Sequence, residues 1–149
     1  MDEPAGGTRS VDAAEGLRII EAILEVAREL ARMRDVFEEA DEPRREEMAA
    51  LFDELSGVLR DIYGAVSEGE TPFGKCLELQ HYARQLPSVI GPEIGVEQAE
   101  RLAKRLAEAN EVEILPRALK AADRFEEIVR LAEAAAMLRT LAISTRAGR

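Results

Sequence analysis

The sequence lacks most of the residue types on which small metal-binding and redox sites depend. Its 149 residues include one cysteine, one histidine and no tryptophan. One cysteine excludes an internal disulfide framework and a cysteine-rich zinc site, and one histidine excludes a site that needs two imidazoles from one chain. Aromatic residues make up only 4%, so the core has to be built from aliphatic side chains and methionine. We therefore expect no cofactor and no metal.

Long apolar runs and a basic surplus are missing too. The run Met48–Phe52 is far shorter than the roughly 20 residues of a membrane helix, and the first ten residues do not form the basic and apolar regions of a signal peptide. The net charge of −10 repels phosphate backbones and anionic lipids. These features predict a cytoplasmic protein that binds neither nucleic acid nor membranes. The single Cys76 fits a reducing compartment, and the preference for Arg over Lys suggests a bacterial source.

Helical periodicity runs through almost the whole chain. Apolar residues recur at three- and four-residue steps, and no segment alternates as a half-buried strand does. The pattern predicts helices over residues 11–40, 43–67, 72–86, 96–109 and 116–143, a disordered lead-in over residues 1–10, a loop over residues 88–95 and a short basic tail over residues 144–149. We predict an all-α fold with one domain over residues 11–143. It is an antiparallel bundle of four principal helices with the shorter third helix beside them.

The first and last helices carry wide apolar faces, each with two stripes. The candidate interaction residues on these faces are Ile20, Leu24 and Met33 in the first helix and Ile128 and Leu138 in the last. Such faces are wider than one neighbouring helix covers. We therefore expect self-association, with a homodimer as the simplest form. The alternative is that the third helix and the following loop cover these faces within one chain.

Charge is distributed unevenly along the chain. Residues 11–70 have a surplus of acids, and residues 117–149 have a surplus of bases. Two interpretations stay open at this point. The two regions pair with each other within the chain, or the acidic first hairpin recognises a basic partner.

His81 lies on the side of the third helix opposite its apolar stripe, so we expect it to face solvent. The run Leu79–Pro87 resembles the phosphoacceptor helices of histidine phosphotransfer proteins, in which an exposed histidine on a bundle helix accepts a phosphoryl group. The resemblance implies a phosphoacceptor role for His81. The small residues and the lysine that follow the histidine in that family are missing here, and the alternative is an ordinary surface histidine.

The neighbours of His81 suggest two further chemistries, and neither is complete. Glu78 and His81 have the Glu-x-x-His spacing of di-iron bundles, but such a site needs two inward-facing motifs. Cys76 falls on the apolar face of the same helix, and five residues do not separate facing positions on a helix. The sequence therefore predicts neither a metal site nor a Cys–His nucleophile.

Together these features predict a non-enzymatic helical protein–protein interaction module, such as an adaptor, an assembly factor or a regulatory subunit. It would act through exposed apolar helix stripes, and the acidic first hairpin would set the choice of partner. Two alternatives from other classes stay open. One is a signalling phosphotransfer protein that uses His81, and the other is an acidic inhibitor or antitoxin-like protein that neutralises a basic partner.

Overall fold

The computed structural model describes residues 11–107 and 114–149, and no strand occurs in these two ranges. The all-α class is therefore confirmed. The long helices are α1 (Val11–Arg32), α3 (Glu42–Ser67), α4 (Phe73–Ile94) and α7 (Val129–Ala147). The shorter elements are α2 (Arg34–Glu38), α5 (Val96–Leu106), α6 (Ile114–Ala121) and the 3₁₀ turn η1 (Glu126–Ile128). The expected lead-in, residues 1–10, lies outside the described residues.

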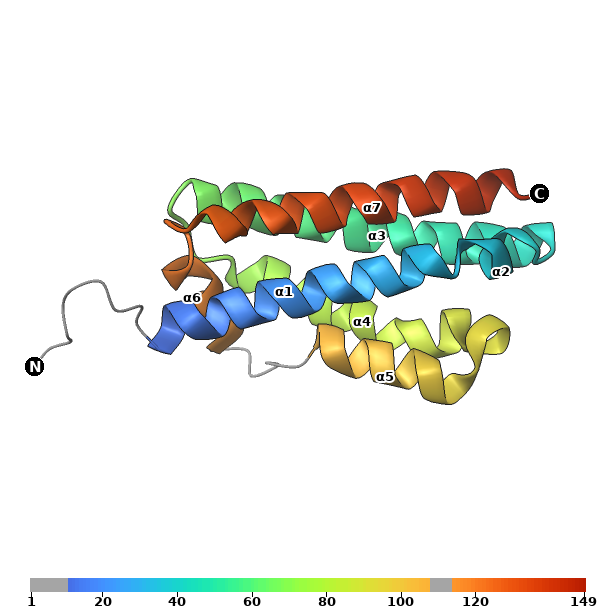
Figure 1. Cartoon of the computed structure of the whole chain (residues 1–149), viewed down its shortest axis with the longest axis horizontal. Helices are drawn as coiled ribbons and strands as arrows, with labels where there is room; N and C mark the ends of the chain where they lie inside the picture. Colours follow the sequence, from blue (N-terminus) through green and yellow to red (C-terminus); the bar gives the residue numbers. More distant parts are fainter. Residues whose placement is uncertain (1–10, 108–113) are drawn as a thin grey trace, which may run out of the picture.

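The long helices lie side by side, and α7 packs against both α3 and α1 (Figure 1). α3 runs antiparallel to α7, because Glu46 near the start of α3 pairs with Arg146 near the end of α7. α1 runs parallel to α7, and Glu21 in its first half pairs with Arg130 at the start of α7. The expected antiparallel arrangement therefore holds for α3 with α7 but not for α1 with α7.

α3 follows its sequence signals closely. It begins one residue before the expected Pro43, and the Asp41 side chain caps it by accepting a hydrogen bond from the Arg44 backbone N–H at 3.2 Å. Gly69 lies just past its end with a φ of +83°, as expected for the left-handed residue that follows a helix.

The first helix ends at Arg32 rather than near Ala40. The backbone leaves helical geometry at Met33 (φ −95°, ψ 14°), and α2 follows as a separate short helix. Phe37 of α2 is buried in the core, where its ring centroid lies 5.2 Å from that of Phe52.

The third helix is much longer than predicted. α4 continues through Pro87 and Pro92, so residues 88–95 do not form the expected loop, and α4 is one of the four long helices. Pro87 and Pro92 have no N–H groups to donate to the carbonyl oxygens four residues earlier, those of Ala83 and Ser88. The Arg44 guanidinium reaches across from α3 and donates to the neighbouring Val89 carbonyl oxygen, so it supports this part of α4 from the side. The last turns of α4 also bury apolar side chains, which offsets the cost of the prolines.

The expected helix over residues 116–143 is divided into α6, η1 and α7. The break lies at Phe125, whose backbone is extended (φ −100°, ψ 144°). It allows α6 to pack on α1 at Gly16, where a Cβ would overlap the Ala118 carbonyl group. α7 also continues to Ala147. Most of residues 144–149 are therefore helical and do not form the expected short tail.

Candidate functional site

The residues expected to contact a partner lie mainly in the core of their own chain. Ile20 and Leu24 are each 1% exposed, Leu138 and Ile128 are also buried, and Met33 is partly buried against the same core. α5, α6 and α7 pack against α1, so the wide face of α1 is covered within one chain. These residues are therefore not part of an exposed surface.

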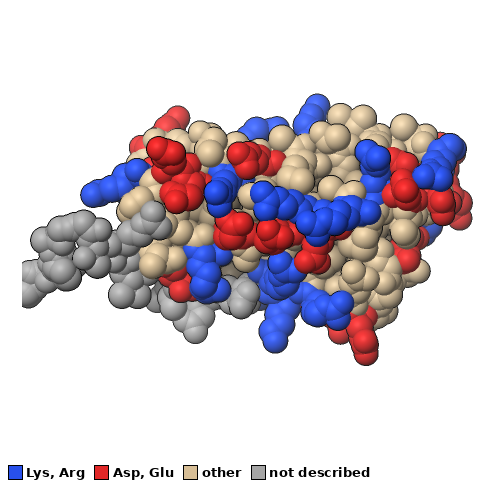
Figure 2. Space-filling model, viewed as in Figure 1, with Lys and Arg blue, Asp and Glu red and all other residues tan. Residues whose placement is uncertain are grey.

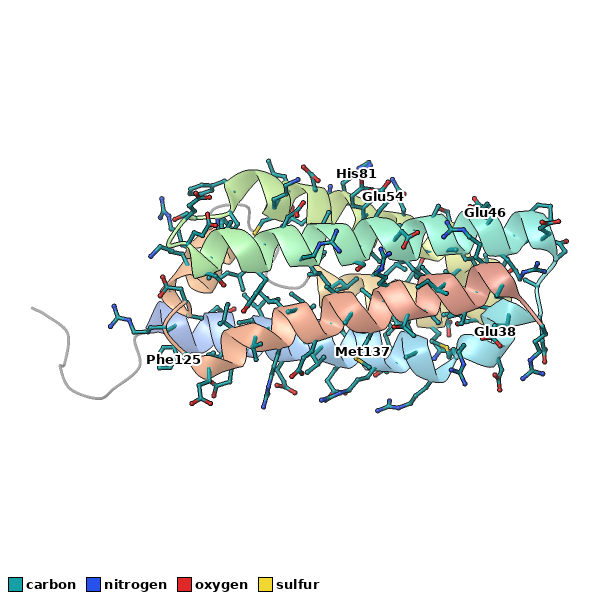
Figure 3. The ribbon with its side chains drawn as sticks, turned by 90° about the horizontal axis from the view of Figure 1, so that it is seen from above. Glu38, Glu46, Glu54, His81, Phe125 and Met137 are labelled. Atoms are coloured by element: carbon teal, nitrogen blue, oxygen red, sulfur yellow. The ribbon has the colours of Figure 1, made fainter. Side chains whose placement is uncertain are left out.

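His81 faces solvent from α4, as expected (Figure 3). Its Nε2 atom lies 2.9 Å from the Gln85 side-chain nitrogen, and its ring lies edge-on to Tyr82 at 5.3 Å. Glu78, the other member of the Glu-x-x-His motif, pairs with Lys75 at 3.3 Å instead. Within the described ranges, no three His, Cys, Asp or Glu residues are grouped so that they could hold a metal ion. His81 is therefore an exposed imidazole next to the neutral amide of Gln85.

Cys76 is buried on the inner face of α4. Burial raises the pKa of its thiol to about 12, because the charged thiolate loses its solvation. The reactive form of cysteine is the thiolate. The thiol therefore stays neutral at physiological pH and behaves as a small apolar side chain.

The acidic first hairpin pairs with the basic end of α7. Arg146 donates to both carboxylate oxygens of Glu46 and to Asp53, each at 3.0 Å. The hydrogen bond from Arg146 lowers the pKa of Glu46, and the same contact raises the pKa of Arg146. Arg149 forms further ion pairs, at 3.1 Å with Asp35 and at 3.3 Å with Glu39. Part of the acidic surplus is therefore neutralised within the chain.

Other acids are paired with arginines along α1. Arg28 donates to Glu25 at 2.8 Å, and Arg105 of α5 donates to Glu29 at 2.6 Å. Figure 2 shows basic and acidic side chains next to one another across the middle of the face in view. The charged surface of this side therefore consists of local pairs rather than of one large field of a single sign.

The outward side of α7 differs from this charged surface, because it exposes a line of apolar and small residues. This α7 face consists of Val129, Ala132, Ala136, Thr140 and Ile143, which follow one another at helical steps of three or four residues. Val129 is 44% and Ile143 is 58% exposed. On α4, by contrast, the exposed Phe73 and Leu77 are followed on the same side by His81, so the apolar part is short.

Two shallow depressions border the centre of the α7 face, and Ala136 lines both of them. A third lies at the Val129 end of this face and is lined otherwise by charged residues of η1 and α7. The depression toward α1 is lined by Ala31, Ala136, Met137 and Thr140. Figure 3 shows Met137 on this side of α7. The depression toward α3 is lined by Ser56, Arg60, Ala132, Ala135, Ala136 and Arg139. The Ser56 hydroxyl donates to the Ala135 carbonyl at 2.7 Å and holds the two helices together. The α7 face is thus a low ridge on which another helix could pack closely.

Glu133 and Arg139 flank the centre of the α7 face, and both are exposed. Within residues 11–107 and 114–149, neither side chain has an ion-pair partner. Arg130 and Arg146 on the same helix are both paired within the chain. Two opposite charges are therefore available beside an exposed apolar line.

No family model, curated protein or solved structure compared with this chain matches it. In the described parts of the chain, no helix is both long and apolar enough to cross a membrane.

Val129, Ala132 and Ala136 follow one another at helical spacing in the sequence, but the contact residues predicted in the last helix were Ile128 and Leu138. The break at Phe125 separates α7 from α6, and these three residues then face outward. No glycine or proline marks this break in the sequence. The available signal was the run of alanines, Ala134–Ala136, whose small side chains permit a close helix contact on more than one side.

Proposed function

We propose that this protein is a non-enzymatic helical protein–protein interaction module that binds through the α7 face. The observation that carries the proposal is the exposed apolar line from Val129 to Ile143, bordered by two depressions that meet at Ala136. Exposed apolar surface of this kind is costly in water and is a common feature of interaction sites. The buried, neutral thiol of Cys76 is not available as a nucleophile, which supports a non-enzymatic role.

Substitution of Ala136 tests this proposal. The full chain is used as bait, and bound proteins, including further copies of the chain itself, are identified by native mass spectrometry. Ala136→Glu places a charge at the centre of the α7 face, so we expect it to abolish binding while the circular dichroism spectrum stays unchanged. Leu77→Glu on the exposed side of α4 is the matched control and should bind as the wild type does. Equal binding by wild type and Ala136→Glu would rule out the α7 face.

A second candidate function is phosphotransfer through His81. The observation that favours it is the exposed imidazole, which a phosphodonor can reach. Phosphoramidate is a suitable probe, because it phosphorylates accessible histidines directly. This function requires an acid-labile phosphoryl group on the wild type and none on His81→Ala. It also requires that a response-regulator aspartate accepts the group from His81, because surface histidines without this role can also be labelled.

The third class, an acidic inhibitor that neutralises a basic partner, receives less support. Arg146 and Arg149 occupy carboxylates of the first hairpin, so a basic partner would have to displace them. We propose a cytoplasmic setting for the module, and the free thiol of Cys76 supports a reducing compartment.

A further inference from the structure

The α7 face is symmetric about Ala136. Val129 lies seven residues before Ala136, and Ile143 lies seven residues after it. Seven residues are almost two helical turns, so these three residues lie nearly on one line along the helix. A large exposed apolar side chain stands at each end, and a methyl group lies at the centre. A second α7 that packs antiparallel, Ala136 against Ala136, would bring each Val129 level with Ile143 of the other copy.

The available charges follow the same symmetry. Glu133 lies three residues before Ala136, and Arg139 lies three residues after it, so each is about 4.5 Å from Ala136 along the helix axis. In the antiparallel arrangement, each Glu133 is level with Arg139 of the other copy, and the long side chains extend across a seam of small residues. In a parallel arrangement, Glu133 would be level with Glu133. Charge therefore selects the antiparallel orientation, which the helix dipoles also favour.

We infer that the partner of the α7 face is a second copy of this chain, packed antiparallel about a twofold axis at Ala136. This inference rests on the proposed function and names the partner of the same surface. Ala136 lines both depressions, so a close approach at this residue brings the neighbouring side chains of the second copy into them. Neither Glu133 nor Arg139 has to leave an ion pair within its own described chain. The contact therefore gains opposite charges without breaking existing pairs.

The size of the face sets the expected strength of the dimer. α7 has 19 residues and is about 28 Å long. A contact between two α7 helices and the adjoining edges of α1 and α3 is a small interface. Interfaces of this class bury less than roughly 1,200 Å² in total and are often transient. We therefore expect a dimer whose population rises with protein concentration, visible by sedimentation velocity over a dilution series.

Charge reversal tests the pairing of Glu133 with Arg139. Glu133→Arg and Arg139→Glu should each raise the dissociation constant of the homodimer by about tenfold, because each variant places like charges at the same level. The double variant should recover the wild-type constant, and so should a mixture of the two single variants, in which every pair is again opposite. If neither the double variant nor the mixture recovers dimerisation, the antiparallel contact is wrong.

Disulfide cross-linking tests the axis and the orientation, and the buried Cys76 does not compete for the oxidant. Ala136→Cys lies on the twofold axis and should give covalent dimers on mild oxidation. Val129→Cys and Ile143→Cys should cross-link when mixed, and neither should do so alone. Cross-linking of Val129→Cys with itself would show a parallel pair and overturn the inference. Leu77→Cys on α4 is the control and should stay monomeric.

This experiment separates the inference from the proposed function. A chain that is monomeric at every concentration, with no cross-linking of Ala136→Cys, overturns the homodimer. The proposed function then still stands if another protein binds the wild type and is lost from Ala136→Glu. If no protein binds the wild type and the chain stays monomeric, both proposals are wrong.

Discussion

Gly16 lies where α1 meets α6, and a Cβ at this position would overlap the carbonyl group of Ala118. Replacement of glycine by alanine inside a helix usually stabilises it by up to about 1 kcal/mol. Here the backbone of α6 would have to move, so we expect Gly16→Ala to lower the free energy of unfolding by about 1–3 kcal/mol. Urea denaturation measures this change. The control is Gly64→Ala in α3, where no atom lies within 4 Å, and it should leave stability unchanged or raise it.

Cys76 provides a second test of the packing at residue level. Its thiol has a pKa of about 12, and the thiolate is the form that attacks disulfide reagents. We expect no reaction with an aromatic disulfide reagent in the native protein up to about pH 9, near the pKa of a free thiol, and complete reaction in denaturing urea. Fast labelling of the native chain would show that α4 does not bury this side chain.

Helix boundaries could be predicted where the signals are local. The Asp41 cap, Pro43 and Gly69 define α3 in the sequence itself, and the structure follows them. Pro87 and Pro92 predicted a loop, and this prediction was wrong because contacts from α3 and burial of apolar side chains support the helix there. Those contacts involve residues far apart in the sequence, so periodicity alone does not reveal them.

Arg44 is the contact through which α3 supports the second half of α4. Its guanidinium donates to the Glu93 carboxylate at 2.7 and 3.0 Å and to the Val89 carbonyl oxygen. The hydrogen bonds to Glu93 raise the pKa of Arg44. The Arg44 and Glu93 side chains are only 27% and 13% exposed. Arg44→Ala leaves a partly buried carboxylate without its cation, so we expect a loss of about 1–3 kcal/mol in the free energy of unfolding.

Hydrogen exchange locates this effect within the chain. In Arg44→Ala, the amides of residues 88–94 should exchange faster than in the wild type, and those of α7 should change less. Arg28→Ala is the matched control, because its partner Glu25 lies at the surface and such a pair is worth less than about 1 kcal/mol. If the two variants lose the same stability, Arg44 does not support the second half of α4.

At the scale of the whole molecule, the candidate site was harder to predict than the fold class. The all-α class follows from periodicity, and the exposure of His81 follows from its place on one helix. Ile20 and Leu24 were expected to face a partner, but helices from distant parts of the sequence cover them. The outward position of Ala136 depends on the break at Phe125, which removes α6 from the line of α7. Which apolar stripe faces outward is therefore decided by the packing of the whole chain.

The ion pairs between the acidic hairpin and α7 make stability depend on pH in a predictable direction. The hydrogen bond from Arg146 holds the pKa of Glu46 below its ordinary value of 4.5, so the unfolded chain binds a proton at higher pH than the folded chain does. The ion pair therefore contributes to stability above pH 4.5, and this contribution is lost as the pH falls through the lower pKa that Glu46 has in the folded chain. We expect the wild type to melt slightly above Arg146→Ala near neutral pH and the difference to vanish in acid.

Thermal melts of both chains across this range measure the difference, at a protein concentration low enough to keep them monomeric. High salt should also reduce it, because both partners are exposed to solvent. Arg139→Ala is the control, since Arg139 has no carboxylate partner in the described residues and its removal should add no step near the pKa of Glu46. A difference that stays constant from neutral to acid pH would mean that Arg146 stabilises the chain through its aliphatic stem, and the basic end of α7 would then not be held by charge.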